Sequence, residues 1–424
     1  MTRLLMVMAI LLSATVFAQP GGQDSTKVFK KKVLEAPEVD FLMSYYTQDG
    51  ENAAVSGGLG TEKLNNITPT IVVSVPLNED DVLTIDGEVS AYTSASSSNI
   101  NPFDGSQPAD PFVESTGASS GDTWLNATAT YSHSSDDRNR IWSAKLSVSN
   151  EFDYFSFGFG GGYTWLFNEK NTELSLHGNI YLDTWYPVYP YELRPGNFSN
   201  SSAYNPVFTP FTNDKRNSYS AGFVLSQILS KRLQGSLAAD YILQKGLLST
   251  PFQRVYFKDF NPVYVDNFRL ADDVERLPDS RYKVAFGGRL HYYINQVFVA
   301  RFFYRYYFDE WGIESQTVNL ELPVKISGSF TLYPSYRYYS QTAADYFAPY
   351  AAHSSDEQYY TSDYDLSGFS ANQFGFGVSY TDIFTKFHIS RFGLKSVDLK
   401  YYRYSRNINF NANLIEFGCK FIMD

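Results

Sequence analysis

The residues best suited to bind a charged group are cationic side chains that lie on one face of segments in which the two faces alternate residue by residue. In the segment 297–310, Arg301 and Arg305 alternate with a row of aromatic and small residues. Neighbouring segments carry further cations in the same alternating pattern: Arg281, Lys283, Arg289, His291 and Arg337. Glu321 is the main acidic exception among them. If this row faces water, it can attract anionic groups and repel cations.

An acidic pair stands in the segment 80–95, where Asp86 and Glu88 occupy alternate positions. Counted along the expected strands, this segment is the third and 297–310 is the eleventh, so a closed sheet of sixteen places them diametrically opposite. Both acids lie about as far from a short turn as the two arginines do. We therefore predict a transverse field at one depth, which would orient dipolar or zwitterionic solutes. The competing interpretation is that these charges pair with neighbours in the lumen and close it.

A second candidate site lies where the same segments end. Tyr307, Asp309, Tyr339 and Gln341 are expected to point inward near the extracellular mouth, together with Arg337. They could contact an entering solute. They could equally form an Arg–Asp–Tyr network that ties the segment 247–280 to the wall.

No catalytic or cofactor site can be singled out. A serine hydrolase needs a serine and a histidine within hydrogen-bond reach, but serine is abundant and His177 and His291 show no spacing that selects a partner. The single cysteine, Cys419, excludes an intrachain disulfide framework and a multi-cysteine metal site. We expect no enzyme, no cofactor and no bound metal.

Acidic residues in the segment 96–122 leave one alternative open. Their oxygen atoms could bind calcium, but the spacing matches no twelve-residue calcium loop, so solvated surface acids are the favoured interpretation. The residues concerned are Asp104, Asp110, Glu114 and Asp122.

Alternation with a period of two predicts the elements that position these residues, because successive side chains of a strand point to opposite faces. An arginine at mid-bilayer costs roughly 2–4 kcal/mol, so the arginine-bearing face must look inward and the aromatic face outward. The predicted strands are 38–48, 62–77, 80–95, 121–134, 138–150, 153–167, 172–187, 216–229, 232–246, 281–294, 297–310, 313–326, 328–342, 369–383, 395–407 and 409–422.

The connections between these strands alternate in length, as in an up-and-down membrane barrel. Tight turns such as Ser230–Lys231 fall at one end, while the long polar segments 96–120, 188–215, 247–280 and 343–368 all fall at the other. The connection 384–394 is the exception, since it should be short and yet carries Lys386, His388 and Arg391. The fold class is therefore all-β, a closed antiparallel barrel of about sixteen strands.

The N-terminus and the composition favour export. Arg3, an apolar run from Leu4 to Leu12 and small residues before Gln19 are typical of a signal peptide. Aromatic residues reach 17%, as expected of a barrel with aromatic girdles at both membrane interfaces, and a net charge of -11 argues against nucleic acid as partner. We expect a signal peptide at 1–18, a flexible periplasmic leader at 19–37 and an outer-membrane barrel at 38–424, in contact with outer-membrane lipid, lipopolysaccharide and the assembly machinery.

Four stretches resemble an outer-membrane barrel family known as domain of unknown function 3570. They are Thr250–Tyr256, Arg276–Arg281, Tyr307–Ile313 and Tyr336–Gln341. The resemblance implies an envelope barrel and says nothing about a substrate. Two functions remain open: a passive porin-like channel for small polar solutes, and a closed barrel that serves as scaffold, receptor or assembly partner.

Overall fold

The computed structural model describes residues 30–93, 122–194, 203–265 and 267–423. Within these residues the chain forms one closed antiparallel barrel of sixteen wall strands. The wall consists of β1 (Glu38–Gly50), β2 (Leu64–Pro76), β3 (Asp81–Tyr92), β4 (Asp122–Ser134), β5 (Arg140–Asn150), β6 (Tyr154–Phe167), β7 (Thr172–Trp185), β8 (Lys215–Ser230), β9 (Leu233–Gly246), β14 (Ser280–Tyr293), β15 (Val299–Asp309), β16 (Glu314–Glu321), β18 (Phe330–Gln341), β19 (Phe369–Thr381), β21 (Phe392–Arg406) and β22 (Phe410–Met423). Two short pieces extend it, β17 (Val324–Lys325) after β16 and β20 (His388–Ile389) before β21.

Pairing of the first strand with the last closes the barrel. β1 runs antiparallel to both β2 and β22, from Glu38 opposite Ile422 to Gly50 opposite Phe410. Each wall strand pairs with the next one along the chain, so the prediction of sixteen strands and their order is confirmed. Closure leaves no edge strand in the wall.

One face of the sheet stays inside throughout. Residues opposite each other in a ladder share a face, and the registers link Glu88 to Asn126 on one side and Arg301 to Glu321 on the other. The opposite face carries apolar side chains that are strongly exposed, including Leu146 at 58%, Leu237 at 63% and Phe374 at 63%. The outer wall is therefore apolar and the lumen polar, as the alternation predicts.

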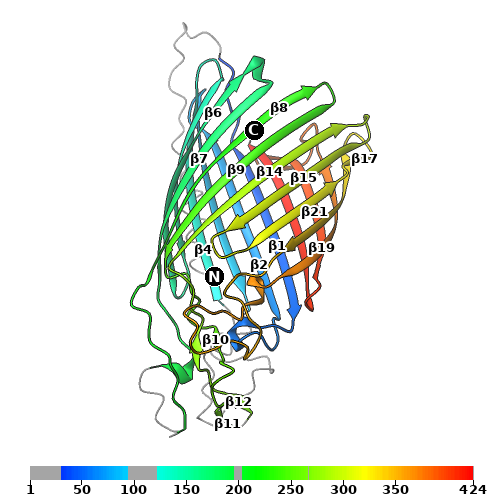
Figure 1. Cartoon of the computed structure of the whole chain (residues 1–424). Coiled ribbons are helices and arrows are strands. Elements are labelled where there is room, and N and C mark those ends of the chain that lie inside the picture. The colour runs from blue at the N-terminus through cyan, green and yellow to red at the C-terminus, as the bar shows by residue number, and fades with distance from the viewer. Residues whose placement is uncertain (1–29, 94–121, 195–202, 266, 424) are drawn as a thin grey trace.

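The two ends of the barrel differ in their connections (Figure 1). Both ends of the barrel sequence, near Glu38 and Met423, lie at the end with short turns, and the amide of Met423 donates to the carbonyl of Pro37. The long connections lie at the opposite end. No helix among the described residues is long and apolar enough to span a membrane. The expected signal peptide and residues 19–29 of the leader lie outside the described residues.

The described part of the leader is attached to the barrel rather than free. Lys30 forms ion pairs with Asp80 and Asp136, and Arg138 donates to the carboxylate of Asp80 and to the carbonyl oxygens of Lys31 and Glu79. Lys30 is therefore bound to the barrel, whereas the sequence predicts a flexible, solvated leader over residues 19–37. Its partners come from two turns, 77–80 and 135–139, which the sequence pattern alone could not bring together.

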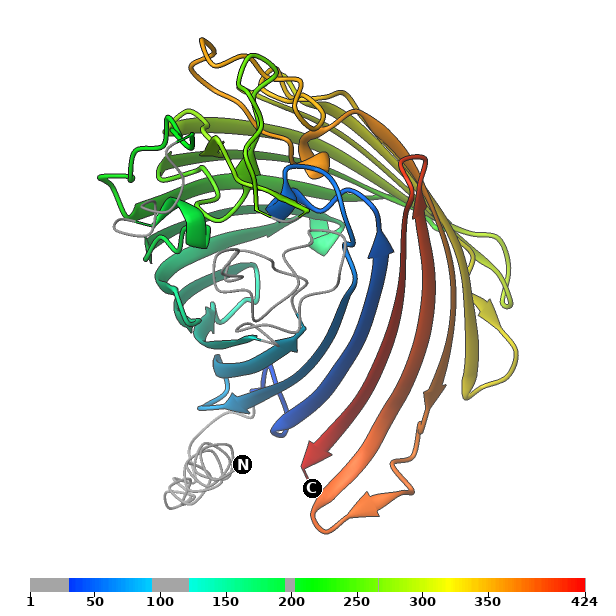
Figure 2. The same ribbon diagram turned by 90° about the horizontal axis from the view of Figure 1, so that it is seen from below.

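Four long connections pack together over one side of the mouth (Figure 2). We call the described residues of 51–63, 186–214, 247–279 and 342–368 the loop cap. It contains the 3-10 turns η2 (Ala54–Ser56), η4 (Tyr191–Leu193) and η5 (Tyr364–Leu366) and two small hairpins. These pair β10 (Arg254–Val255) with β13 (Asp273–Val274), and β11 (Tyr264–Val265) with β12 (Phe268–Arg269). The cap joins the wall through a buried cluster of Leu248, Leu277, Trp311, Ile313 and Ala344.

Candidate functional site in the lumen and its mouth

One arc of the lumen is basic. The registers of β14, β15, β16 and β18 place the predicted cations on the inner face, with Arg289 opposite Phe303 and Arg337 opposite Asn319. The inward cations of this arc are Arg281, Lys283, Arg289, Arg301, Arg305, Lys325 and Arg337. His291 faces inward beside them, opposite Arg301.

Only part of this charge is neutralised locally. Arg301 pairs with Glu321 at 2.7 Å, and Arg281 pairs with Asp309. Arg289 lies over the ring of Phe303 at 5.2 Å. Arg305 and Arg337 form no ion pair with any residue that the structure describes. The interpretation that lumen charges simply pair with neighbours thus fits Arg301 but not these two.

The opposite arc is acidic. β3 and β15 are eight positions apart among the sixteen wall strands, so Asp86 and Glu88 do face the basic arc across the barrel. The acidic arc extends from β3 through β1 and β22 to β21, which lies four strands from β15. Glu38, Asp40, Asp398 and Glu416 face inward on these strands, together with the cations Lys400, Arg406 and Lys420. Lys420 is engaged by Glu38 at 2.7 Å.

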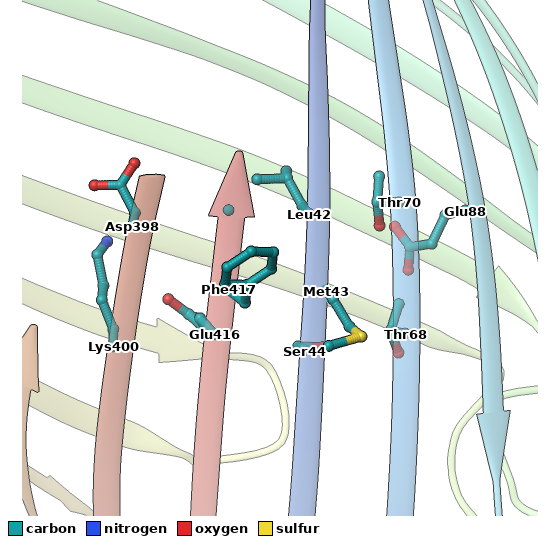
Figure 3. A pocket seen from close by; sticks show the side chains of 11 residues that line it. Leu42, Met43, Ser44, Thr68, Thr70, Glu88, Asp398, Lys400, Glu416 and Phe417 are labelled. Carbon is teal, nitrogen blue, oxygen red and sulfur yellow. The ribbon is translucent and has the colours of Figure 1, made fainter. Parts of the chain in front are cut away.

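A recess of about 450 Å³ lies in this acidic arc (Figure 3). Three carboxylates and one ammonium line it, from Glu88, Asp398, Glu416 and Lys400. Ser44, Thr68 and Thr70 add hydroxyl groups, and Leu42 adds an apolar side chain. The acidic arc therefore offers oxygen acceptors over several strands, whereas the sequence interpretation named only the two acids of β3.

The registers place the four charges at comparable distances from the short turns. The hairpin before β3 is centred at residue 79 and the hairpin before β15 at residue 296. Counted from these centres, Asp86 and Glu88 lie seven and nine residues along β3, and Arg301 and Arg305 lie five and nine residues along β15. Arg301, the nearest of the four to a turn, also lines a recess with Val297, Lys325 and Gly328.

The four residues predicted at the mouth are used mainly in structural contacts. Asp309 has a fully buried carboxylate that binds the Arg281 guanidinium and accepts hydrogen bonds from Tyr307 Oη at 2.6 Å and from the amides of Trp311 and Ile313. Tyr339 donates to Gln341 at 2.6 Å. Gln341 in turn donates to the carbonyls of Asp365 and Ser367 in the cap. This is the Arg–Asp–Tyr network that the sequence left as the alternative to a solute site.

A buried ion pair holds three cap segments together. Arg254 donates to both carboxylate oxygens of Glu192, at 2.7 and 3.1 Å, and both side chains are completely shielded from solvent. A third hydrogen bond, 3.1 Å long, reaches the carbonyl of Val55. The Arg254 guanidinium also lies 5.0 Å from the ring centre of Phe268. One side chain thus links 247–279 to 186–214 and to 51–63.

A buried carboxyl group joins the fourth segment. Glu275 accepts a hydrogen bond from the amide of Thr250 at 2.7 Å and one from the hydroxyl of Thr361. Burial, with the charge of the neighbouring Asp363 as the next cause, raises the pKa of Glu275 to about 8. Burial likewise raises the pKa of Asp363 to about 6, with Asp365 as the next cause. Glu275 is consequently protonated at neutral pH, where it costs the cap no buried charge.

The cap residues Glu192, Arg254, Glu275 and Thr361 were missed by the sequence interpretation. Their partners lie in different loops, and loops have no periodicity that predicts which residues meet. One signal was present, because Arg254 falls within one of the four stretches that carry the family resemblance.

Neither inward histidine of interest belongs to a nucleophilic dyad. His177 lies 3.3 Å from Asp240, and neither His177 nor His291 is hydrogen-bonded to a serine in the described chain. The described residues also contain no group of three or more His, Cys, Asp or Glu side chains able to hold a metal ion. Asp104, Asp110 and Glu114 lie outside the described residues.

Residues 7–413 match the family described as "Protein of unknown function (DUF3570)". The chain belongs to this family. Of the four stretches noted above, Thr250–Tyr256 lies in the cap, and Tyr307–Ile313 covers the end of β15 and the turn that follows it. No curated protein matches the chain.

Several solved barrels are similar to this DUF3570 protein at low identity. A bacterial polysaccharide outer membrane secretin shares 10% identity over 92% of this chain and 99% of its own, with a TM-score of 0.47. The TodX monoaromatic hydrocarbon channel shares 9% over 92% and 91%, with a TM-score of 0.41. The outer membrane protein OpdK from Pseudomonas aeruginosa shares 8% over 91% and 99%, with a TM-score of 0.39.

Proposed function

We propose that this protein is an outer-membrane channel for small polar solutes, with its N-terminus in the periplasm and its loop cap at the cell surface. The observation that carries the proposal is the division of the lumen into a basic and an acidic arc. Arg305 and Arg337 on one side face Asp86 and Glu88 on the other, across a barrel whose strand number is sufficient for an aqueous interior. Guanidinium groups that have no carboxylate partner in the described part of the chain need water or a passing anionic group.

The exposed apolar outer wall supports the membrane location. Leucine and aromatic side chains in this quantity would be a severe aggregation liability in water, whereas a bilayer solvates them. The short turns, which lie beside both termini, would then face the periplasm.

The preferred solutes are expected to be dipolar or zwitterionic, because a transverse field orients separated charges and disfavours apolar molecules. We propose no catalytic role: among the described residues, neither His177 nor His291 is hydrogen-bonded to a serine.

Single-channel conductance of the refolded protein in a planar bilayer tests this function. We expect stable, salt-dependent conductance whose anion-to-cation selectivity falls in the double variant Arg305→Ala, Arg337→Ala. The matched control is Arg403→Ala, which removes a guanidinium from the outer face of β21, where it contacts Asn411 and Asn413. A folded but silent barrel would refute the channel and favour the alternative of a closed receptor or scaffold, for which the rigid loop cap would be the binding surface. A conducting barrel with unchanged selectivity would refute the role of the arginines.

A further inference from the structure

The turn between β19 and β21, residues 382–391, exposes large apolar side chains at the end of the barrel that carries the termini. Ile383 is 61% exposed, Phe384 75%, Phe387 56% and Ile389 56%. Leaving such side chains in water is unfavourable by about 25 cal/mol for each Å² of apolar surface that could be buried. A turn whose only task is to reverse the chain would need none of them.

The turn is held in a defined conformation that directs these side chains outward. The carboxylate of Asp382, 6% exposed, accepts hydrogen bonds from the backbone amides of Phe384, Lys386 and Phe387, at 3.3, 2.8 and 3.2 Å. The short strand β20 then pairs with the beginning of β21. Because the backbone is fixed in this way, the phenyl rings do not collapse onto the wall.

Exposed cations stand among the apolar side chains. Lys386 and Arg391 are exposed, and the ammonium of Lys386 lies 5.6 Å from the ring centre of Phe384. The one acidic residue of the turn, Asp382, is buried against backbone amides. The exposed surface of the turn therefore combines positive charge with apolar area.

This surface continues the outer wall of the barrel. The rings of Phe330 and Tyr380, both on the outer face, pack 5.1 Å apart where β18 begins and β19 ends. Ile326, in the adjacent turn, is 61% exposed. Exposed apolar side chains thus lie both on this part of the outer wall and in the turns beside it.

We propose that the turn 382–391 anchors the barrel to anionic phospholipid in the leaflet that adjoins its turn end, an inference that rests on the proposed membrane location. Phe384 and Phe387 enter the boundary between headgroups and acyl chains, where aromatic rings are favoured. Lys386 and Arg391 meet the phosphates, and each such cation strengthens binding to an anionic surface roughly fivefold (about 1 kcal/mol).

Site-directed spin labelling in lipid vesicles tests the anchor. The native thiol of Cys419, on the outer face of β22, is first removed by Cys419→Ser. Labels are then placed by Phe387→Cys in the turn, by Leu399→Cys in the middle of the outer wall, and by Lys31→Cys as a water-exposed reference, and their accessibility to oxygen and to a water-soluble nickel chelate is compared. In vesicles of phosphatidylcholine with phosphatidylglycerol, the label at 387 should favour oxygen, as the label at 399 does.

Charge reversal separates anionic lipid from apolar contact alone. The double variant Lys386→Glu, Arg391→Glu should move the label at 387 toward water in vesicles with phosphatidylglycerol and leave the label at 399 unchanged. A label at 387 that behaves like the one at 31 would overturn the proposal and leave the turn as a surface for a soluble partner. An unchanged depth after charge reversal would overturn the recognition of anionic lipid. If the label at 399 itself lay in water, the proposed membrane location would fail, and this result is distinct from the other two.

Discussion

Removal of Arg254 should loosen the loop cap while the barrel stays folded. In Arg254→Met, the Glu192 carboxylate loses both hydrogen bonds from the guanidinium and keeps, in the described chain, one contact with the amide of Ala271 at 3.4 Å. Both side chains of the pair are fully buried, so an uncompensated charge would remain inside the cap. Loss of one partner from a buried pair costs about 3–5 kcal/mol.

This free energy should appear as local opening. A cost of that size raises the open population of the cap about 10²- to 4 × 10³-fold, since each tenfold change corresponds to about 1.4 kcal/mol. Limited proteolysis of the native protein, with cleavage sites located by mass spectrometry, measures this opening within 247–279. The heat-modifiable electrophoretic mobility of the barrel serves as the check that the wall remains closed.

Two controls make the result specific. Lys215→Met removes an ammonium that is 57% exposed at the rim, and its effect should stay below about 0.5 kcal/mol. The double variant Arg254→Met, Glu192→Met removes both charges together and should recover most of the protection. If Arg254→Met were as resistant as the wild type, or if the double variant were as sensitive as the single one, the argument from a buried charge would be refuted.

Three further predictions concern separate features. The cap should loosen as the pH rises from about 4.5 toward 8, because the raised pKa of Glu275 makes the folded cap hold a proton that the open cap releases. The contribution of Glu275 to cap stability is full below about pH 4.5 and is lost as the pH passes about 8. Glu275→Gln should flatten this dependence when proteolysis of the cap is measured across that range. Gly246→Ala should lower the free energy of unfolding of the barrel by at least about 1–2 kcal/mol, because Gly246 has φ of 113° and a Cβ would lie 2.0 Å from the carbonyl oxygen of Lys215. The control Gly328→Ala, whose Cβ would meet nothing within 4 Å, should fold normally, as judged by heat-modifiable electrophoretic mobility. Asp80→Asn should release the leader, since Lys30 and Arg138 both bind that carboxylate. Trypsin should then cleave after Lys30 faster, with no change in the electrophoretic mobility of the barrel. An unchanged cleavage rate would mean that other contacts hold the leader.

The wall could be predicted because strand alternation is a local property. The arginines of β15 determine which face looks inward, and every ladder then carries that choice to the next strand, so the facing of Asp86, Arg305 and Arg337 was correct. The depth of a charge along the barrel is set less directly, because the length of a turn shifts a strand along its axis without changing the alternation.

The cap could not be predicted for the opposite reason. Arg254 meets Glu192 and Val55 only after three connections fold over the mouth, and these residues are separated by 62 and 199 positions in the chain. The docking of Lys30 on Asp80 and Asp136 has the same character, since a run of lysines at a terminus is compatible with free solvation. Contacts of this kind depend on the closed barrel and not on any local pattern.

The ion pair of Arg254 with Glu192 also limits how the loops of the cap can change. Surface loops usually accept insertions and substitutions independently of one another. Here a change at Glu192 in one loop removes the carboxylate that neutralises the buried Arg254 of a second loop, and a change at Glu275 affects Thr361 in another. Sequence drift in these four loops is therefore expected to be concerted. With the cap at the cell surface, as proposed, an antibody or phage that selects against one loop would be escaped only by compensating changes in the neighbouring loops.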